Sequence, residues 1–201
     1  MTPDDVRHAA QWLAEELRAR PEDVVDYDRT AQGLRWSVWR TLEHVLDDLV
    51  VDALQVAGRV RDAYLPLSGP QGQELVHCDR ASGAEGMAAS LEACGELLAA
   101  ALQVRPATAR AYHPYGETDP AGYAALGVLE VVVHGWDVLS ALDDEVADLP
   151  EDLCAGVLSR LFPGSPTELG TAQEVLLWQT GRGELPGRGR LSRWRPSPEV
   201  R

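Results

Sequence analysis

The sequence predicts an all-α protein in which four long antiparallel helices form a four-helix bundle, followed by short C-terminal helices and an Arg-rich tail. Three observations support this prediction. Helix start signals followed by helical apolar periodicity recur along the chain. Glycine or proline punctuates the ends of these runs. No series of alternating apolar and polar residues indicates a sheet, and only the stretch 59–67 is compatible with a short strand.

The first two helices are expected from their capping residues and their apolar spacing. Thr2 followed by Pro3 is an N-cap with proline in the first turn, and apolar residues then recur at helical spacing up to about Arg18. Ser37 is expected to cap the second helix, which continues to Gly58 because glycine commonly terminates helices.

The remaining helices follow from similar signals. Ser82 and Glu85 have the spacing of a capping box and are expected to open the third helix. Asp119 followed by Pro120 repeats the start signal and begins the fourth. Later breaks at proline and glycine leave room for two shorter helices. The expected ranges are 83–103, 119 to about 142, 150–162 and 167–180.

Composition excludes several classes of function. The 201 residues contain 32 acidic and 18 basic side chains, a formal charge of -14 that repels nucleic acid and anionic membranes. The N-terminus lacks a signal-peptide pattern, and we expect no segment to approach the ~20 apolar residues of a membrane span. Three cysteines without CxxC spacing indicate reduced thiols. We therefore expect a cytoplasmic protein, a monomer or a homodimer, that binds neither nucleic acid nor membrane.

Arginine supplies every basic side chain, and Lys, Asn and Ile are absent. Their absence indicates a GC-rich genome, most plausibly actinobacterial, and excludes Schiff-base chemistry on lysine. Residues 1–181 are expected to form the acidic, metal-binding helical bundle, and residues 182–201 an Arg/Gly/Pro-rich C-terminal tail. The tail is interpreted either as a solvated segment lying across the acidic bundle or as the source of an anion-binding arginine.

The expected fourth helix combines an apolar surface on all sides with a narrow polar stripe. The apolar surface predicts a central buried helix. Four side chains fall within about 60° of one another at about 100° per residue, namely Tyr123, Glu130, His134 and Asp137. A buried carboxylate is strongly destabilising unless it is paired or bound to a metal. Glu130 therefore needs a partner in the folded protein.

Glu130 and His134 are spaced so that both side chains reach one point beside the helix. Two interpretations stay open at this stage, an internal hydrogen bond between them or a shared divalent cation. A catalytic divalent site needs a third protein ligand and an open position. His44 is the best candidate because it lies midway along the expected second helix. It sits on a polar facet that either lines a pocket or is exposed.

Two stretches resemble the signatures of a known family. Residues 36–45, WSVWRTLEHV, resemble the W-(S/T)-V-x5-H-(L/V) helix of the DinB-like superfamily, in the branch of the mycothiol-dependent maleylpyruvate isomerase N-terminal domain. Residues 130–138, EVVVHGWDV, resemble the second signature, E-x3-H-x-W-D. Residues 176–187 are similar to the closing helix of this branch, so the resemblance covers about residues 5–190.

The resemblance implies a metal centre and its chemistry. A divalent metal, zinc first and nickel or another ion otherwise, would be held by His44, Glu130 and His134. Asp137 and Arg40 are then the candidate catalytic residues, Asp137 as the acidic residue that orients a ligand or a metal-bound water. The family implies mycothiol as co-substrate, bound as a thiolate. Isomerases of this branch have a second, C-terminal domain, so we expect a substrate other than maleylpyruvate.

The expected function is transfer of the thiol to a small electrophile, or cis-trans isomerisation of that electrophile through reversible addition. Two alternatives stay open. A hydrolase or lyase would use metal-activated water, with Asp137 or a loop residue as base. A non-catalytic metal-binding regulatory module would close the site with a fourth protein ligand, and His113 and Asp48 are the candidates.

Overall fold

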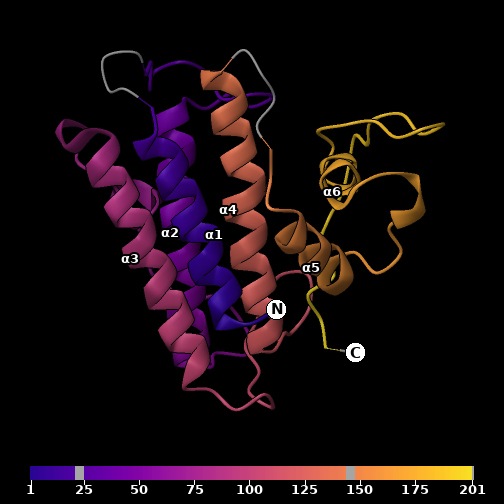
Figure 1. The fold of residues 1–201 in the computed structure, drawn as a ribbon. Helices are drawn as coiled ribbons and strands as arrows, with labels where there is room; N and C mark the ends of the chain where they lie inside the picture. The colour runs from indigo at the N-terminus through magenta and orange to yellow at the C-terminus, as the bar shows by residue number, and fades with distance from the viewer. Residues whose placement is uncertain (21–24, 144–147, 201) are drawn as a thin grey trace.

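The computed structural model describes residues 1–20, 25–143 and 148–200. The described part is all-helical, as predicted, and 59–67 contains no strand. Four long helices lie side by side, and two short ones follow on the side of the fourth that faces away from the third (Figure 1). Their bounds are α1 Pro3–Arg18, α2 Val38–Gly58, α3 Gly83–Gln103, α4 Pro120–Leu142, α5 Glu151–Leu161 and α6 Ala172–Gln179.

Three of the predicted helix caps are confirmed. Thr2 accepts a hydrogen bond from the Asp5 backbone N–H, and the Asp5 carboxylate completes a capping box that the sequence reading did not identify. Ser37 caps α2, and Asp119 caps α4, each through a side-chain oxygen that accepts a backbone N–H of the first turn. These contacts satisfy N–H groups that have no partner within a helix.

The predicted capping box of Ser82 and Glu85 is wrong. A short 3-10 turn, Arg80–Ser82, leads directly into α3, so Ser82 already has helical backbone angles. Its hydroxyl donates to the Asp79 carbonyl instead of accepting from the helix. The helix predicted over 167–180 is also divided: a 3-10 turn covers Thr167–Leu169, and α6 starts after a separate cap.

The helix directions differ from the expected antiparallel array. Arg20 pairs with Asp143, and the Trp12 ring lies against Gly135, so α1 and α4 run in the same direction. Just beyond the end of α3, Arg105 donates to the Ala57 carbonyl near the end of α2, so these two helices are also parallel. Both α1 and α2 pack against α3 and α4.

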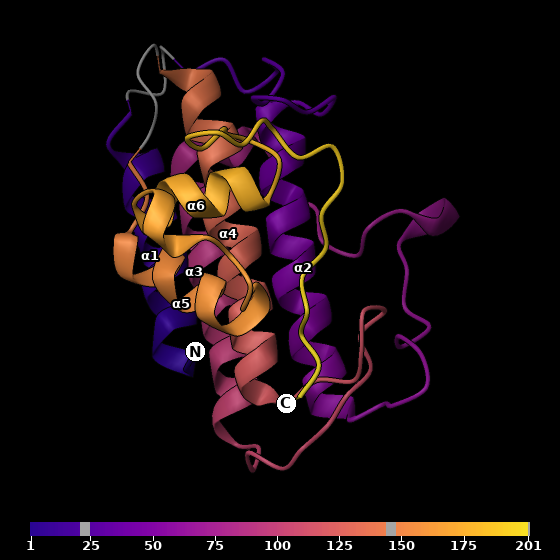
Figure 2. The ribbon, with the colours of Figure 1, turned by 90° about the vertical axis from the view of Figure 1, so that its right-hand side faces the viewer.

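Because α2 and α3 are parallel, the chain between them must return along the whole length of α2, about 30 Å for 21 residues. This connection, 59–82, runs along the outer side of α2 (Figure 2). Buried Gln55 forms three hydrogen bonds with backbone groups of residues 60–65. Asp47 and Glu43 accept backbone N–H groups of residues 75–78. Polar side chains of α2 thus fix the path of the returning chain.

Helix α4 is the most buried of the long helices. It packs against α1, α2, α3 and α5, and α6 lies next to α5 (Figure 2). Helix α4 is long and apolar enough to cross a membrane, so the expectation that no segment approaches the ~20 apolar residues of a membrane span is wrong. Of its most apolar 18-residue stretch, 78% is buried inside the protein, because the surrounding helices provide an apolar environment.

The C-terminal segment follows the helical body rather than standing apart from it. Trp178 donates its indole N–H to the Gly189 carbonyl. Near the end of the chain, the Pro198 carbonyl accepts hydrogen bonds from Thr118 and Arg160. The tail predicted over 182–201 is therefore anchored at several points, although Arg190, Arg193 and Arg195 among its side chains are exposed.

We predict that Gly95→Ala lowers the free energy of unfolding by about 1–3 kcal/mol, because an added Cβ would lie 2.5 Å from the Cβ of Ala10 and force α1 and α3 apart. Gly156→Ala is the matched helical control. Its added methyl meets only the flexible Met1 side chain. We therefore expect the higher helix propensity of alanine to raise the free energy of unfolding by up to about 1 kcal/mol. Urea unfolding measures both, and equal effects would contradict the close contact of α1 and α3.

Candidate metal centre

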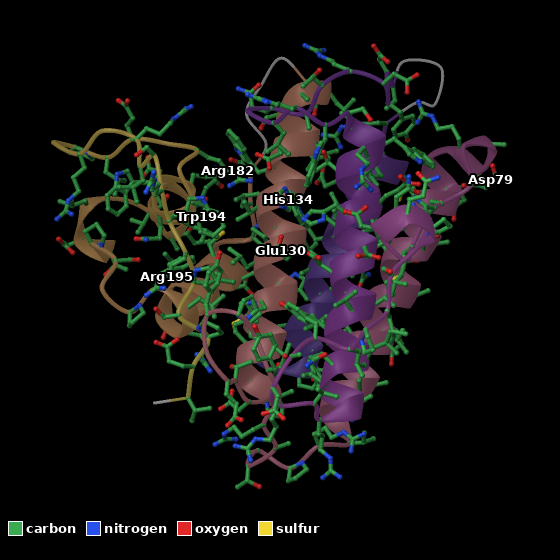
Figure 3. All side chains as sticks on the ribbon, turned by 180° about the vertical axis from the view of Figure 1, so that it is seen from behind. Asp79, Glu130, His134, Arg182, Trp194 and Arg195 are labelled. Atoms are coloured by element: carbon green, nitrogen blue, oxygen red, sulfur yellow. The ribbon has the colours of Figure 1, made fainter. Side chains whose placement is uncertain are left out.

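The three predicted metal ligands come together between α2 and α4. His44, Glu130 and His134 each offer one ligand atom, and these atoms all lie within 4.8 Å of one another. The His134 Nε2 atom is 3.2 Å from a Glu130 carboxylate oxygen, and the two imidazole centroids are 5.2 Å apart. Figure 3 shows Glu130 and His134 one turn apart on the same side of α4. The polar facet of α2 that carries His44 therefore faces this cluster.

His134 is oriented by a chain of charged groups on the side of the C-terminal segment. Its Nδ1 atom lies 3.0 Å from a carboxylate oxygen of Asp137, which is fully buried. Arg182 donates to both oxygens of that carboxylate, at 2.8 and 2.6 Å. This two-pronged contact fixes the carboxylate as well as neutralising it. Figure 3 shows Arg182 approaching His134 from the segment after α6.

A corresponding chain of groups orients His44. Its Nδ1 atom lies 3.2 Å from a carboxylate oxygen of Glu74, which belongs to the connection after α2. The other oxygen of Glu74 pairs with Arg40. Arg40 also lies over the Trp36 ring, 5.6 Å from its centroid. Arg40, predicted as a catalytic residue, is thus placed where it positions Glu74 rather than among the ligand atoms.

Both imidazoles therefore have Nδ1 occupied by a carboxylate, which leaves Nε2 as the nitrogen that each can offer to a cation. Carboxylates that hold the second nitrogen of a histidine are the usual support of a metal-binding imidazole, because they fix its orientation and increase its basicity. The donor set of two imidazoles and one carboxylate fits a divalent cation of the zinc type. The cluster thus meets the chemical requirements of the metal site expected from the sequence.

The electrostatics of the cluster favour a positive charge at its centre. Burial lowers the pKa of His134, but hydrogen bonds to Asp137 and Glu130 outweigh burial and raise it to about 9. Burial acts against ionisation of Glu130, yet the hydrogen bond to His134 lowers the pKa of that carboxyl. Burial, with the charge of His134, lowers the pKa of His44. A divalent cation would take the place of the His134 proton.

The two candidate fourth ligands lie near the cluster but outside it. A carboxylate oxygen of Asp48 is 3.4 Å from His44 Nε2. The His113 ring stacks edge-on against Tyr115, 5.5 Å between centroids, in the connection before α4. Among the described residues, the group of mutually close ligand atoms contains only the three predicted ligands. Three protein ligands is the number that a catalytic zinc site has.

Two cavities adjoin the cluster from different sides. The first, about 410 Å³, is reached by both ligand histidines and is bordered by the C-terminal segment, including Arg182, Arg190 and Trp194. The second, about 220 Å³, contains Glu130 in its wall together with residues of α2 and of the two long connections. The cluster therefore lies between an arginine- and tryptophan-lined space and an acidic one.

Sequence reasoning missed Glu74 and gave Arg182 no specific partner. Glu74 lies in an irregular connection, 30 residues after His44, and no local pattern marks its role. Arg182 is one of six arginines in the tail, and only the packing of that segment selects it as the partner of Asp137. The family-like E-x3-H-x-W-D stretch did provide one signal, because a buried Asp137 requires a cationic partner.

Replacing Arg182 by Met is expected to lower the free energy of unfolding by about 3–5 kcal/mol, because it leaves the Asp137 carboxylate buried without its cation. The matched control is Arg190→Met, an exposed arginine of the same segment with one backbone contact, and its effect should stay below about 1 kcal/mol. Urea unfolding of the two variants checks this, and similar losses would contradict the role of the pair.

Replacing Glu74 by Ala is expected to weaken zinc binding about 10–100-fold, because His44 then loses the carboxylate that orients its ring. Glu117→Ala provides a control, since Glu117 pairs with Arg61 away from the cluster. Competition with a zinc-binding fluorophore gives both affinities. Unchanged affinity in the Glu74 variant would show that the carboxylate has no part in metal binding.

Comparisons with protein-family models, with curated proteins and with solved structures found no match to this chain.

Proposed function

We propose that this protein is a metal-dependent enzyme that joins a low-molecular-weight thiol, mycothiol, to a small electrophile, by S-transfer or by reversible addition with cis-trans isomerisation. The proposal includes the DinB-like four-helix bundle as the fold of α1–α4. The observation that carries it is the cluster of His44, Glu130 and His134, three convergent ligand atoms beside a cavity. Zinc suits this donor set best, and nickel or another divalent ion is the alternative.

When bound, the divalent ion would hold the thiol sulfur and lower its pKa, which supplies a nucleophilic thiolate at neutral pH. The protein residues provide the conditions for this chemistry. Glu74 and Asp137 hold the two imidazoles through Nδ1, which leaves Nε2 of each ring for the metal. Arg182 keeps Asp137 in place and neutralises its charge. Rigid placement of this kind is what a catalytic site requires of the groups around its ligands.

The larger cavity is the proposed binding site of the thiol co-substrate. Its volume, about 410 Å³, lies in the usual range of small-molecule sites. Trp36 and Trp194 border it and are each partly exposed, so they offer flat apolar surfaces on which a sugar ring can stack. Arg190 borders it as well. Within the described residues its guanidinium donates to one backbone carbonyl, so further N–H groups remain for a polar ligand.

A metal-dependent hydrolase or lyase is the second candidate, and Asp48 favours it. Burial, together with the charge of Glu130, raises the pKa of Asp48 well above its ordinary value. Its carboxylate oxygen lies 3.4 Å from His44 Nε2 and lines the cavity beside Glu130, which places it where it could accept a proton from an activated water. A non-catalytic regulatory module is disfavoured because the described ligand cluster has three members rather than a closed set of four.

The test is metal analysis followed by thiol titration. The full-length protein should contain one zinc ion per chain, and His134→Ala should lose it because two ligands cannot retain the ion. His8→Ala, an exposed histidine near the start of α1, is the control and should retain full occupancy. Mycothiol added to the zinc protein should bind with release of about one proton per chain, measured by calorimetry in buffers of different ionisation enthalpy.

Each failure of this test has a distinct meaning. Full zinc occupancy in His134→Ala would contradict the metal centre itself. Normal zinc content without mycothiol binding would contradict the thiol-dependent reaction and favour the hydrolase. Thiol binding without proton release would show that the sulfur is not held as a thiolate.

A further inference from the structure

The acidic cavity on the Glu130 side of the cluster has a composition that the metal centre does not explain. Its volume is about 220 Å³, and carboxylates from α2 and α4 lie in its wall. Asp47 already accepts two backbone N–H groups, and Glu130 belongs to the metal centre. Asp48 lies 3.4 Å from His44 Nε2, so Asp52 is the carboxylate that neither the metal centre nor the returning chain explains. Among the described residues that line this cavity there is no arginine to balance the charges of these carboxylates.

Asp52 is the most informative of these side chains. Its relative exposure is 8%, and it has neither a hydrogen bond nor an ion pair with any described residue. Burial, and then the charge of Glu130, raise the pKa of this carboxyl well above its ordinary value. A buried carboxylate without a partner is strongly unfavourable, so a group that brings positive charge into the cavity would satisfy it.

An aromatic wall completes the cavity. Tyr64 lines it, partly exposed, and its ring meets Tyr112 edge-on with 5.5 Å between centroids. Tyr64 shares the cavity wall with Asp48 and Asp52, and burial, with the charges of these carboxylates, raises the pKa of its phenol. An aromatic face beside paired carboxylates is a favourable environment for an organic cation, because the ring quadrupole and the negative charges attract it together.

The described residues do not favour a second metal ion in this cavity. The carboxylates of Asp48, Asp52 and Glu130 do not form a group of ligand atoms within 4.8 Å of one another, whereas the neighbouring cluster does. A volume of about 220 Å³ is also far larger than a bare ion occupies. The space fits a cationic group of several atoms.

We propose that this cavity binds an organic ammonium group, and that the electrophilic substrate carries that group. Asp52 and Asp48 provide the negative charge, and Tyr64 provides the aromatic wall. The assignment to a substrate rests on the proposed function, because Glu130 stands both in the cavity wall and in the metal centre. The thiol then occupies the arginine-lined cavity and the cationic electrophile the acidic one, with the reacting atoms meeting at the ligand cluster between them.

The experiment compares choline with 3,3-dimethylbutan-1-ol, a neutral molecule of the same shape, in ligand-observed NMR titrations of the zinc-loaded full-length protein. Choline cannot coordinate a metal through its quaternary nitrogen, so its binding reports on the cavity. We expect choline to bind at least tenfold more tightly than the alcohol. Asp52→Asn should weaken choline binding at least tenfold and leave one zinc per chain, because Asp52 is not among the metal ligands.

One control variant and one further test variant complete the experiment. Asp152→Asn removes the same charge from an exposed position on α5 and should leave choline affinity unchanged. Tyr64→Leu should weaken choline binding several-fold while the circular dichroism spectrum stays that of the wild type. Equal affinity for choline and the alcohol, or equal weakening by Asp52→Asn and Asp152→Asn, would overturn the proposal.

Metal content separates the remaining outcomes. Two zinc ions per chain in the wild type, falling to one in Asp52→Asn, would identify the cavity as a second metal site and overturn the ammonium proposal. Choline binding without thiol binding would contradict the proposed thiol chemistry but support the cation site. Thiol binding with no preference for choline would support the thiol chemistry and contradict the cation site.

Discussion

The structure depends on the compensation of buried charge along α4. This helix lies among four others, yet it carries Glu130, His134 and the fully buried Asp137. No solvent reaches Asp137, so other parts of the chain must supply its partner. Arg182 does so from beyond α6, which explains why the C-terminal segment returns to the face of α4 rather than extending into solvent.

The direction of the helices also determines part of the geometry of the site. Because α2 and α3 are parallel, the connection 59–82 passes along α2, where Gln55, Asp47 and Glu43 hold it. That path brings Glu74 to the second nitrogen of His44. An antiparallel pair would need only a short turn between these helices and would leave His44 without this carboxylate. Helix topology and ligand orientation are thus two consequences of one chain path.

The ligand cluster separates two environments of different charge. Arginine and tryptophan side chains border one cavity, and carboxylates with a tyrosine line the other. The formal charge of -14 is therefore not only a property of the solvated surface, because part of it is concentrated beside the cluster in Asp48 and Asp52. Such a division places groups of opposite charge on two sides of one cluster, so each cavity favours ligands of a different charge.

Local sequence determined the helices and most of their ends, because caps at Thr2, Ser37 and Asp119 act within one turn. It also determined the periodicity that sets Glu130, His134 and Asp137 on one stripe of a buried helix. The tertiary structure alone decided the helix directions and the choice of Glu74 and Arg182 as charged partners. It also brings His44, already a ligand candidate in the sequence, against that stripe. Those features arise from contacts 30 to 123 residues apart in the chain, which local propensity and spacing do not encode.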